Sequence, residues 1–266
     1  MALYVNTNVS AIDAANNLNT TEMALEKSTQ QLSSGLRINS AADDAAGLTI
    51  SESLQSQISG VDQANRNAQD GVSLVQTASG AITQVQQMLQ RIRELAVQYG
   101  NGTLNSTDQT AIQTEVNQLL SEIDQIGQTA QFNGTYLLKS SATLTFQIGA
   151  NDGETISVAT VSLGSSVGTI SLGTSTTLST IESAISALSG VASTFGAVQN
   201  RLQYTMANLS SYEENLTSAN SRITNVDMAS AMTAFTSQQV LQQAGTAMLT
   251  QAQKLPQAVL SLLQGA

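Results

Sequence analysis

Two residue types that most enzymes rely on, histidine and cysteine, are missing from this chain of 266 residues. Without histidine there is no Ser-His-Asp triad, no HExxH zinc helix and no imidazole general base. Without cysteine there are no disulfides and no thiolate metal ligands. We therefore expect a protein that is not an enzyme, with no catalytic residues, no metal site and no cofactor.

Charged and aromatic residues are also scarce, at 11% and 3% of the chain. Nine Lys and Arg face nineteen Asp and Glu, and residues 140–200 contain no cation. This balance argues against nucleic acid and against an anionic membrane surface as partners. No window approaches eighteen apolar residues, and the start of the chain lacks the basic and apolar regions of a secretory signal, so we expect neither a transmembrane helix nor a cleaved signal.

What the chain has instead is a seven-residue repeat of apolar and small residues near both ends. Such a repeat keeps one stripe of a helix facing a partner helix. Long helices with so little charge also suggest surfaces that other copies of the chain cover; the alternative is a weakly charged, soluble helical monomer. The repeats are Val61, Ala68, Val75, Ile82, Leu89, Ala96; Ala64, Gly71, Ala78, Val85, Ile92, Tyr99; and Ile181, Leu188, Phe195, Leu202, Leu209, Leu216, Ile223.

The pattern predicts a mainly α fold, a long antiparallel helical rod or coiled coil of paired N- and C-terminal segments, with a small β-hairpin insert in the middle. Gly35 ends the first helix, and Ser106 with Gln109 suggests a capping box. For residues 163–180 the sequence allows either a further strand or a loose loop. The expected helices are 5–32, 48–99, one beginning near 106, 178–223 and 226–263, the last with a ladder at Ala234, Leu241, Met248, Leu255 and Leu262; the expected strands lie at 144–148 and 156–158.

Several long motifs make the chain resemble bacterial flagellin over both terminal thirds. They occur in the family's order, which makes the likeness specific. The motifs are NTNVSAIDAANNLN (6–19), SSGLRINSAADDAAGLTISE (33–52), QDGVSLVQTASGAI (69–82), QRIRELAVQ (90–98), QIGANDGETI (147–156), NSRITNVDMA (220–229) and LPQAVLSLL (255–263).

The resemblance implies a structural subunit that polymerises into the extracellular flagellar filament, exported without a cleaved signal peptide. Its partners would be copies of itself, an export chaperone and hook-associated proteins. It implies filament-core helices at 1–40 and 227–266, rod helices at 41–138 and 178–226, and a short β-rich central region at 139–177. We predict that both core segments are disordered in the soluble chain and order on polymerisation; the alternative is that they already pair within one chain.

The resemblance also implies recognition by innate immune receptors. Toll-like receptor 5 would read Arg91, Leu95 and Glu115, with Arg91 an exposed anchor beside an apolar leucine. Without that role, Arg91 belongs to a solvated face of i,i+3 ion pairs. Cytosolic immune sensors would read Val259, Leu260, Leu262 and Leu263, whose primary role is more simply that of filament-interior contacts.

Three positions depart from the family pattern, because Ala42, Asn225 and Ala231 each replace a charged residue. The alternative within the superfamily is a hook–filament junction protein, which QRIRELAVQ and the LPQAVLSLL ending disfavour. A flagellin with a protease in its middle region would need HExxH, and a purely signalling or adhesive ligand would need a larger middle. Four methionines on helical stretches are predicted to fill gaps in the core rather than to bind a cofactor: Met206, Met228, Met232 and Met248.

Overall fold

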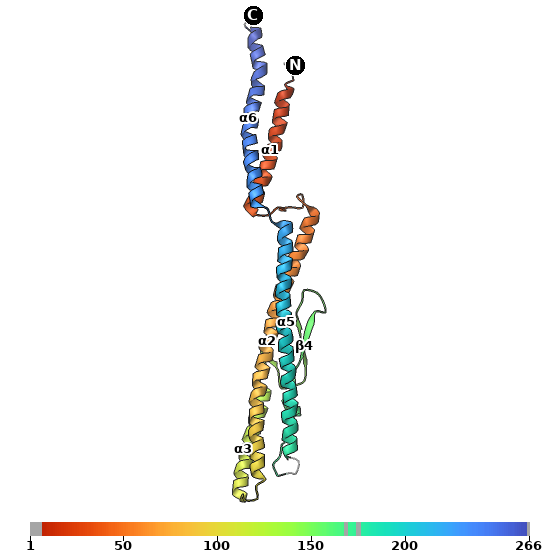
Figure 1. Ribbon diagram of the computed structural model, residues 1–266, viewed down its shortest axis with the longest axis vertical. Helices are drawn as coiled ribbons and strands as arrows, with labels where there is room; N and C mark the ends of the chain where they lie inside the picture. The colour runs from red at the N-terminus through yellow and green to blue at the C-terminus, as the bar shows by residue number, and fades with distance from the viewer. Residues whose placement is uncertain (1–6, 168–169, 174–176, 265–266) are drawn as a thin grey trace. The chain divides into compact units, whose positions relative to one another are not determined.

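The computed structural model describes residues 7–167, 170–173 and 177–264, without the side chains of residues 166 and 255–264 (Figure 1). The chain divides into two compact units. The first comprises Met1–Ser56 and Leu216–Ala266, and the second comprises Gln57–Asn215. The elements are α1 (Val9–Ser34), α2 (Ala45–Tyr99), α3 (Ser106–Thr129), β1 (Gln131–Phe132), β2 (Thr135–Tyr136), β3 (Thr143–Gln147), β4 (Thr155–Ala159), α4 (Leu163–Val167), α5 (Thr177–Thr224) and α6 (Met228–Gln264). The mainly α fold with a small β insert is confirmed.

In the second unit, the predicted seven-residue seams form the core. All six residues of the seam that begins at Val61 are buried, and so are Ile181, Leu188, Phe195 and Leu202 of α5. Gly71 marks close packing, because a Cβ there would meet Leu202 Cδ1 at 3.3 Å and Phe146 Cγ at 3.4 Å. The seven-residue period therefore located the buried faces of α2 and α5 correctly.

Two antiparallel hairpins follow α3. The β1–β2 hairpin turns at Asn133 and Gly134, whose φ angles of 47° and 78° suit a two-residue turn of the I′ type. In β3–β4, Phe146 pairs with Ile156, and Ile156 is fully buried while the alternate residues of β4 face solvent. The predicted hairpin is thus confirmed, and its apolar face joins the core of the second unit.

Two local predictions are corrected. The capping box of α3 is formed by Asn105 and Asp108, one residue before the predicted pair, because the Asn105 side chain accepts hydrogen bonds from the first turn of the helix. For residues 163–180 the sequence allows strand or loose loop, whereas the described part begins with a short helix, α4. Leu163 of α4 is buried in the core of the second unit, and this tertiary contact is absent from any local pattern.

By length and composition alone, α5 could cross a membrane, but the core helix of a soluble protein passes the same test, so the expectation of no transmembrane helix stays an expectation. The most apolar positions of α5 pack within the second unit. Ile181, Leu188, Phe195 and Leu202 recur every seventh residue and lie in the core of the second unit. The helix is apolar on that side because it packs on the rest of the unit.

In the first unit, α1 and α6 lie side by side (Figure 1). Ser28 is buried and its hydroxyl donates to Gln238 Oε1 of α6 at 2.7 Å. Gly35, with a φ of 71°, ends α1 as predicted, and its carbonyl accepts from the Val226 amide. In this structure both terminal helices are formed and pair within the single chain, as in the second of the two alternatives given above. The prediction that α1 and α6 order only on polymerisation concerns the chain in solution and stays a prediction.

Candidate interaction surfaces

A cluster of charged side chains joins α2 to α3 in the second unit. The Arg91 guanidinium contacts Glu115 Oε1 at 3.0 Å and Glu94 Oε2 at 3.2 Å. All three side chains remain about half exposed or more. Hydrogen bonds from Arg91 to Glu115, and then to Glu94, raise the pKa of the guanidinium above its usual value. The cluster is a charged surface held in one geometry, since Arg presents its donors in a planar fork.

The structure brings together two of the three predicted receptor residues and separates the third from solvent. Arg91 and Glu115 form an ion pair, whereas Leu95 is only 2% exposed. Leu95 belongs to the core of the second unit with Ile112 and Val116 of α3. The surface therefore presents the Arg91 anchor without an exposed leucine beside it. Leu95 instead packs in the core and holds α2, the helix that carries Arg91, in place.

The second candidate surface is a groove between α1 and α6 in the first unit, lined by Ser10, Asp13, Ala14, Asn17, Leu18, Thr21, Leu241, Ala244, Gly245 and Met248. Leu241 is 56% and Met248 is 64% exposed, which is high for large apolar side chains. We call these lining residues the α1–α6 groove. Its apolar edge has no cover within the described part of the chain.

This exposure corrects two predictions. The ladder at Ala234, Leu241 and Met248 is not covered by α1. The buried positions among the described side chains of α6 are instead Ala231 and Ala252, and Gly245 packs against Leu18. Three of the four methionines that we expected in the core, Met228, Met232 and Met248, are also about half exposed or more. Only Met206 packs against the core. Periodicity detects an apolar stripe but does not say whether the same chain covers it.

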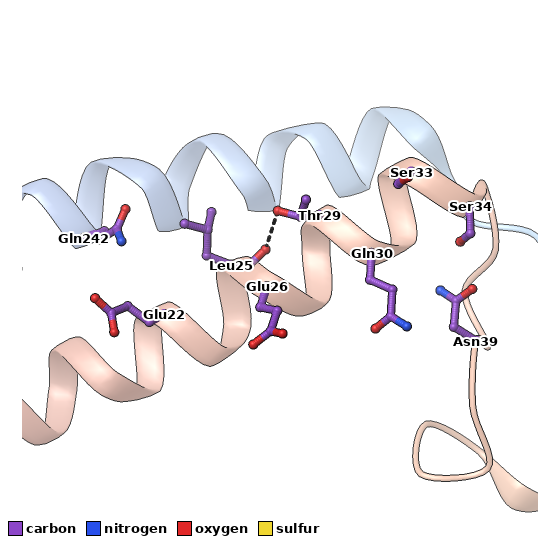
Figure 2. Close-up of a pocket in the computed structure, with 9 residues that line it drawn as sticks. All are labelled: Glu22, Leu25, Glu26, Thr29, Gln30, Ser33, Ser34, Asn39 and Gln242. Atoms are coloured by element: carbon purple, nitrogen blue, oxygen red, sulfur yellow. Dashed lines mark hydrogen bonds between the residues drawn. The ribbon is translucent and has the colours of Figure 1, made fainter.

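Another open groove runs along α1 and is drawn in Figure 2, lined by Glu22, Leu25, Glu26, Thr29, Gln30, Ser33, Ser34, Asn39 and Gln242. The Thr29 hydroxyl donates to the Leu25 carbonyl at 2.8 Å, which is the dashed bond in Figure 2. Glu22 and Glu26 lie one turn apart, where like charges repel weakly. Among the described residues that line the groove there is no Lys or Arg. It offers a polar, solvated face and no arrangement for acid–base or nucleophilic chemistry.

A polar junction follows α1 within the first unit. Lys27 Nζ lies 2.8 Å from Asp43 Oδ1, while Asp43 Oδ2 accepts from the amides of Asn39 and Ser40. The hydrogen bond from Lys27, and then that from the Asn39 amide, lower the pKa of Asp43. Asp44 has a separate task, accepting from the Gly47 amide at the start of α2. The adjacent carboxylates are therefore structural and do not form an acid–base pair.

The three departures from the family pattern have different surroundings. Ala42 is exposed, beside the Lys27–Asp43 pair in sequence. The Asn225 backbone bridges to Leu36, and its side chain donates to Ser221 Oγ at 2.7 Å. Ala231 is only 8% exposed. A charged residue at Ala231 would be costly in this structure, so alanine suits the position.

The structure tests neither the predicted contacts near the end of α6 nor the expected absence of a metal site. Val259, Leu260, Leu262 and Leu263 lie on α6, but their side chains are outside the described part of the structure. Among the residues that are described, no group of three or more Asp and Glu side chains could hold a metal ion.

Sequence reasoning missed the polar contacts between α1 and α6. Asn8 caps α1 by accepting from the Ala11 amide at 3.1 Å, and its Nδ2 donates to the Ala252 carbonyl at 2.7 Å. The first helix was expected to begin near residue 5, which hid the capping role of Asn8. A Ser, Thr, Asp or Asn immediately before the first helical residue is the signal that finds such a cap.

Comparison with known proteins gives the same family along nearly the whole chain. The bacterial flagellin N-terminal helical region matches residues 5–143, and the C-terminal helical region matches residues 178–263. A flagellin from Halalkalibacterium halodurans is 45% identical over 98% of this chain and 100% of its own length. A flagellin from Bacillus subtilis is 41% identical with the same two coverages.

A solved structure supports the same assignment. The crystal structure of Bacillus cereus flagellin is 32% identical, with a TM-score of 0.51, and the match covers 54% of this chain and 88% of that one. With two matching helical regions, full-length relatives and a similar solved fold, the chain belongs to the bacterial flagellin family.

Proposed function

We propose that this chain is a structural subunit that polymerises with copies of itself into the extracellular flagellar filament. The observation that carries the proposal is the α1–α6 groove, whose Leu241 and Met248 are 56% and 64% exposed in the single chain. Apolar side chains that one chain leaves uncovered at regular spacing are the expected interface of a polymer. A repeated contact that does not close into a ring generates a helical filament.

The low charge of the chain supports the same proposal. Charged residues make up only 11% of the sequence, so long helical surfaces carry Ala, Ser, Thr, Asn and Gln instead. Such surfaces approach one another without the desolvation cost of buried charges. Export without a cleaved signal, an export chaperone and hook-associated partners belong to the proposal through the family alone, and we propose no enzymatic activity and neither nucleic acid nor membrane as a partner.

Electron microscopy of the purified full-length chain tests the proposal. Negative staining follows seeding with short filament fragments or addition of a precipitating salt. Long uniform filaments are the expected result. Persistent single chains or short capped stubs would overturn the proposal and favour the hook–filament junction protein.

We propose in addition that toll-like receptor 5 recognises the surface around Arg91. What supports this is a guanidinium fixed by two carboxylates yet about half exposed, because a pre-ordered Arg loses little entropy on binding. Leu95 contributes by packing beneath the helix rather than by contact. Val259, Leu260, Leu262 and Leu263 remain proposed as filament-interior contacts and as the stretch that cytosolic sensors read.

A receptor-reporter assay with two arginine variants distinguishes specific recognition of Arg91 by the receptor from a general effect of removing positive charge. Arg91→Ala should reduce signalling by roughly ten-fold or more, as for a hot-spot residue. Arg93→Ala is the matched control, since Arg93 is exposed on the same helix and forms no ion pair among the described residues. Unchanged signalling by Arg91→Ala, or equal loss in both variants, would refute the assignment.

A further inference from the structure

A helix that contains proline leaves one backbone carbonyl without its usual donor. In an α-helix the N–H of each residue bonds the carbonyl four residues earlier, and proline has no N–H. The chain has a single proline, Pro256, and α6 is helical from Met228 to Gln264. The carbonyl that lacks its intrahelical donor is therefore that of Ala252.

The Asn8 side chain of α1 meets this carbonyl. Its Nδ2 donates to the Ala252 oxygen at 2.7 Å, and its Oδ1 accepts from the Ala11 amide at the start of α1. The two bonds fix the orientation of the Asn8 amide, because the Ala252 carbonyl can only accept a hydrogen bond and the Ala11 amide can only donate one. Asn8 thus caps its own helix and also completes the hydrogen bonding of the partner helix.

Most of the α1–α6 contact carries little information about alignment. The stripe of α6 that faces α1 recurs every seventh residue at Ala231, Gln238, Gly245 and Ala252, with small side chains except at Gln238, and α1 offers Ala11, Leu18 and Leu25 at the same interval. A shift by seven residues, about 10.5 Å along the axis, would place similar residues opposite one another. Apolar packing alone therefore leaves several alignments close in free energy.

Only specific pairs distinguish these alignments. Pro256 is unique in the chain, so only one alignment lets Asn8 reach a carbonyl without a donor. Ser28, which is 6% exposed, donates to Gln238 across the helix pair, and a shifted alignment would lose this contact. After a shift in one direction Ser28 would face Ala231, which has no polar side chain. After a shift in the other direction Gln238 would lie opposite Gly35, just past the end of α1.

We propose that Asn8 fixes the register of the α1–α6 pair by recognising the Ala252 carbonyl that Pro256 leaves free, with Ser28 and Gln238 as a second determinant. The two ends of the chain are matched to one another by hydrogen bonding as well as by apolar burial. This role deepens the proposed function, since a filament needs every subunit to present the same α1–α6 groove. Its test reads the alignment of α1 and α6 within one chain, both in the soluble state and after polymerisation.

Cysteine pairs report the register directly, because the chain has no cysteine of its own. A Cβ built at Gly245 lies 3.9 Å from Leu18 Cβ, within the range for a disulfide. Three double variants share Gly245→Cys and carry Ala11→Cys, Leu18→Cys or Leu25→Cys. The first and third report shifts of seven residues in either direction. Oxidation of the full chain, before and after salt-induced polymerisation, is followed by a denaturing non-reducing gel that separates intrachain from interchain links.

The expected result is that the Leu18→Cys pair forms its intrachain disulfide at least ten-fold faster than either shifted pair in one or both conditions. Asn8→Asp keeps the cap of α1 but removes the donor, and should lower this preference by roughly five-fold or more. Asn8→Ser, which adds no charge, should lower it similarly. Thr29→Ala is the matched control, because its hydroxyl bonds only within α1, and should leave the preference unchanged.

Pro256→Ala distinguishes recognition of the free carbonyl from a general effect of Asn8. In the Pro256→Ala background the Ala252 carbonyl regains a backbone donor, so Asn8→Asp should then change the preference by less than about two-fold. Equal loss with and without Pro256, or shifted pairs that link as fast as the Leu18→Cys pair in both conditions, would overturn the inference. Failure to polymerise would instead count against the proposed function, because the intrachain links report the alignment of α1 with α6 and not the contacts between chains.

Discussion

Replacing Leu241 by glutamine should weaken polymerisation while sparing the fold of the single chain. Leu241 is 56% exposed and lines the α1–α6 groove, so most of its apolar surface is free for another copy to cover. Fully burying a leucine side chain is worth about 1.5–3 kcal/mol, and scaling by the exposed fraction leaves ~0.8–1.7 kcal/mol per subunit. Glutamine has a similar helix propensity, so the helix itself should persist.

The assay is the critical concentration for filament growth, measured by sedimentation after seeding. A loss of that size raises the critical concentration by roughly four- to eighteen-fold. Val240→Gln is the matched control. Val240 is the adjacent residue and is 59% exposed, but it does not line the groove.

Two results would refute the reasoning. An unchanged critical concentration for Leu241→Gln would show that the groove is not an interface between copies. An equal rise for Val240→Gln would show that the polymer senses the apolarity of α6 as a whole rather than the groove. Circular dichroism of both soluble variants confirms that helix content has not changed.

Three further predictions concern the chain before assembly. Phe195→Ala should destabilise the second unit by about 3–5 kcal/mol in chemical denaturation, because Phe195 is 2% exposed, whereas Tyr204→Ala, at a side chain 78% exposed, should change little; similar losses would contradict the core assignment. Asp43 has a lowered pKa, so its carboxylate stabilises the fold above about pH 4, and this contribution is lost as the pH falls through the folded-state pKa. The melting temperature of Asp43→Asn should therefore depend less on pH between about 5 and 2 than that of the unchanged chain, and parallel curves would argue against this role. Amide exchange should be fast in α1 and α6 of the soluble chain and slow in the filament, and strong protection in both states would refute coupled folding.

The sequence determined most of the second unit. Its seven-residue seams place Val75, Ile82 and Leu89 in the core, and each is fully buried as predicted. The sequence predicted the β3–β4 hairpin equally well, since strand alternation and an Asn-Asp-Gly turn are local signals. The motifs at both ends identified the family, because several long matches in order do not arise from composition alone.

Tertiary structure decided which apolar residues are covered and which polar groups meet. Leu95 and Leu241 both occupy apolar helical positions, yet one is 2% and the other 56% exposed, because a periodic stripe records hydrophobicity and not the presence of a neighbour. The contacts of Asn8 with Ala252 and of Ser28 with Gln238 join residues more than two hundred positions apart. No local pattern predicts such pairs, since they exist only once two distant helices have been brought into one register.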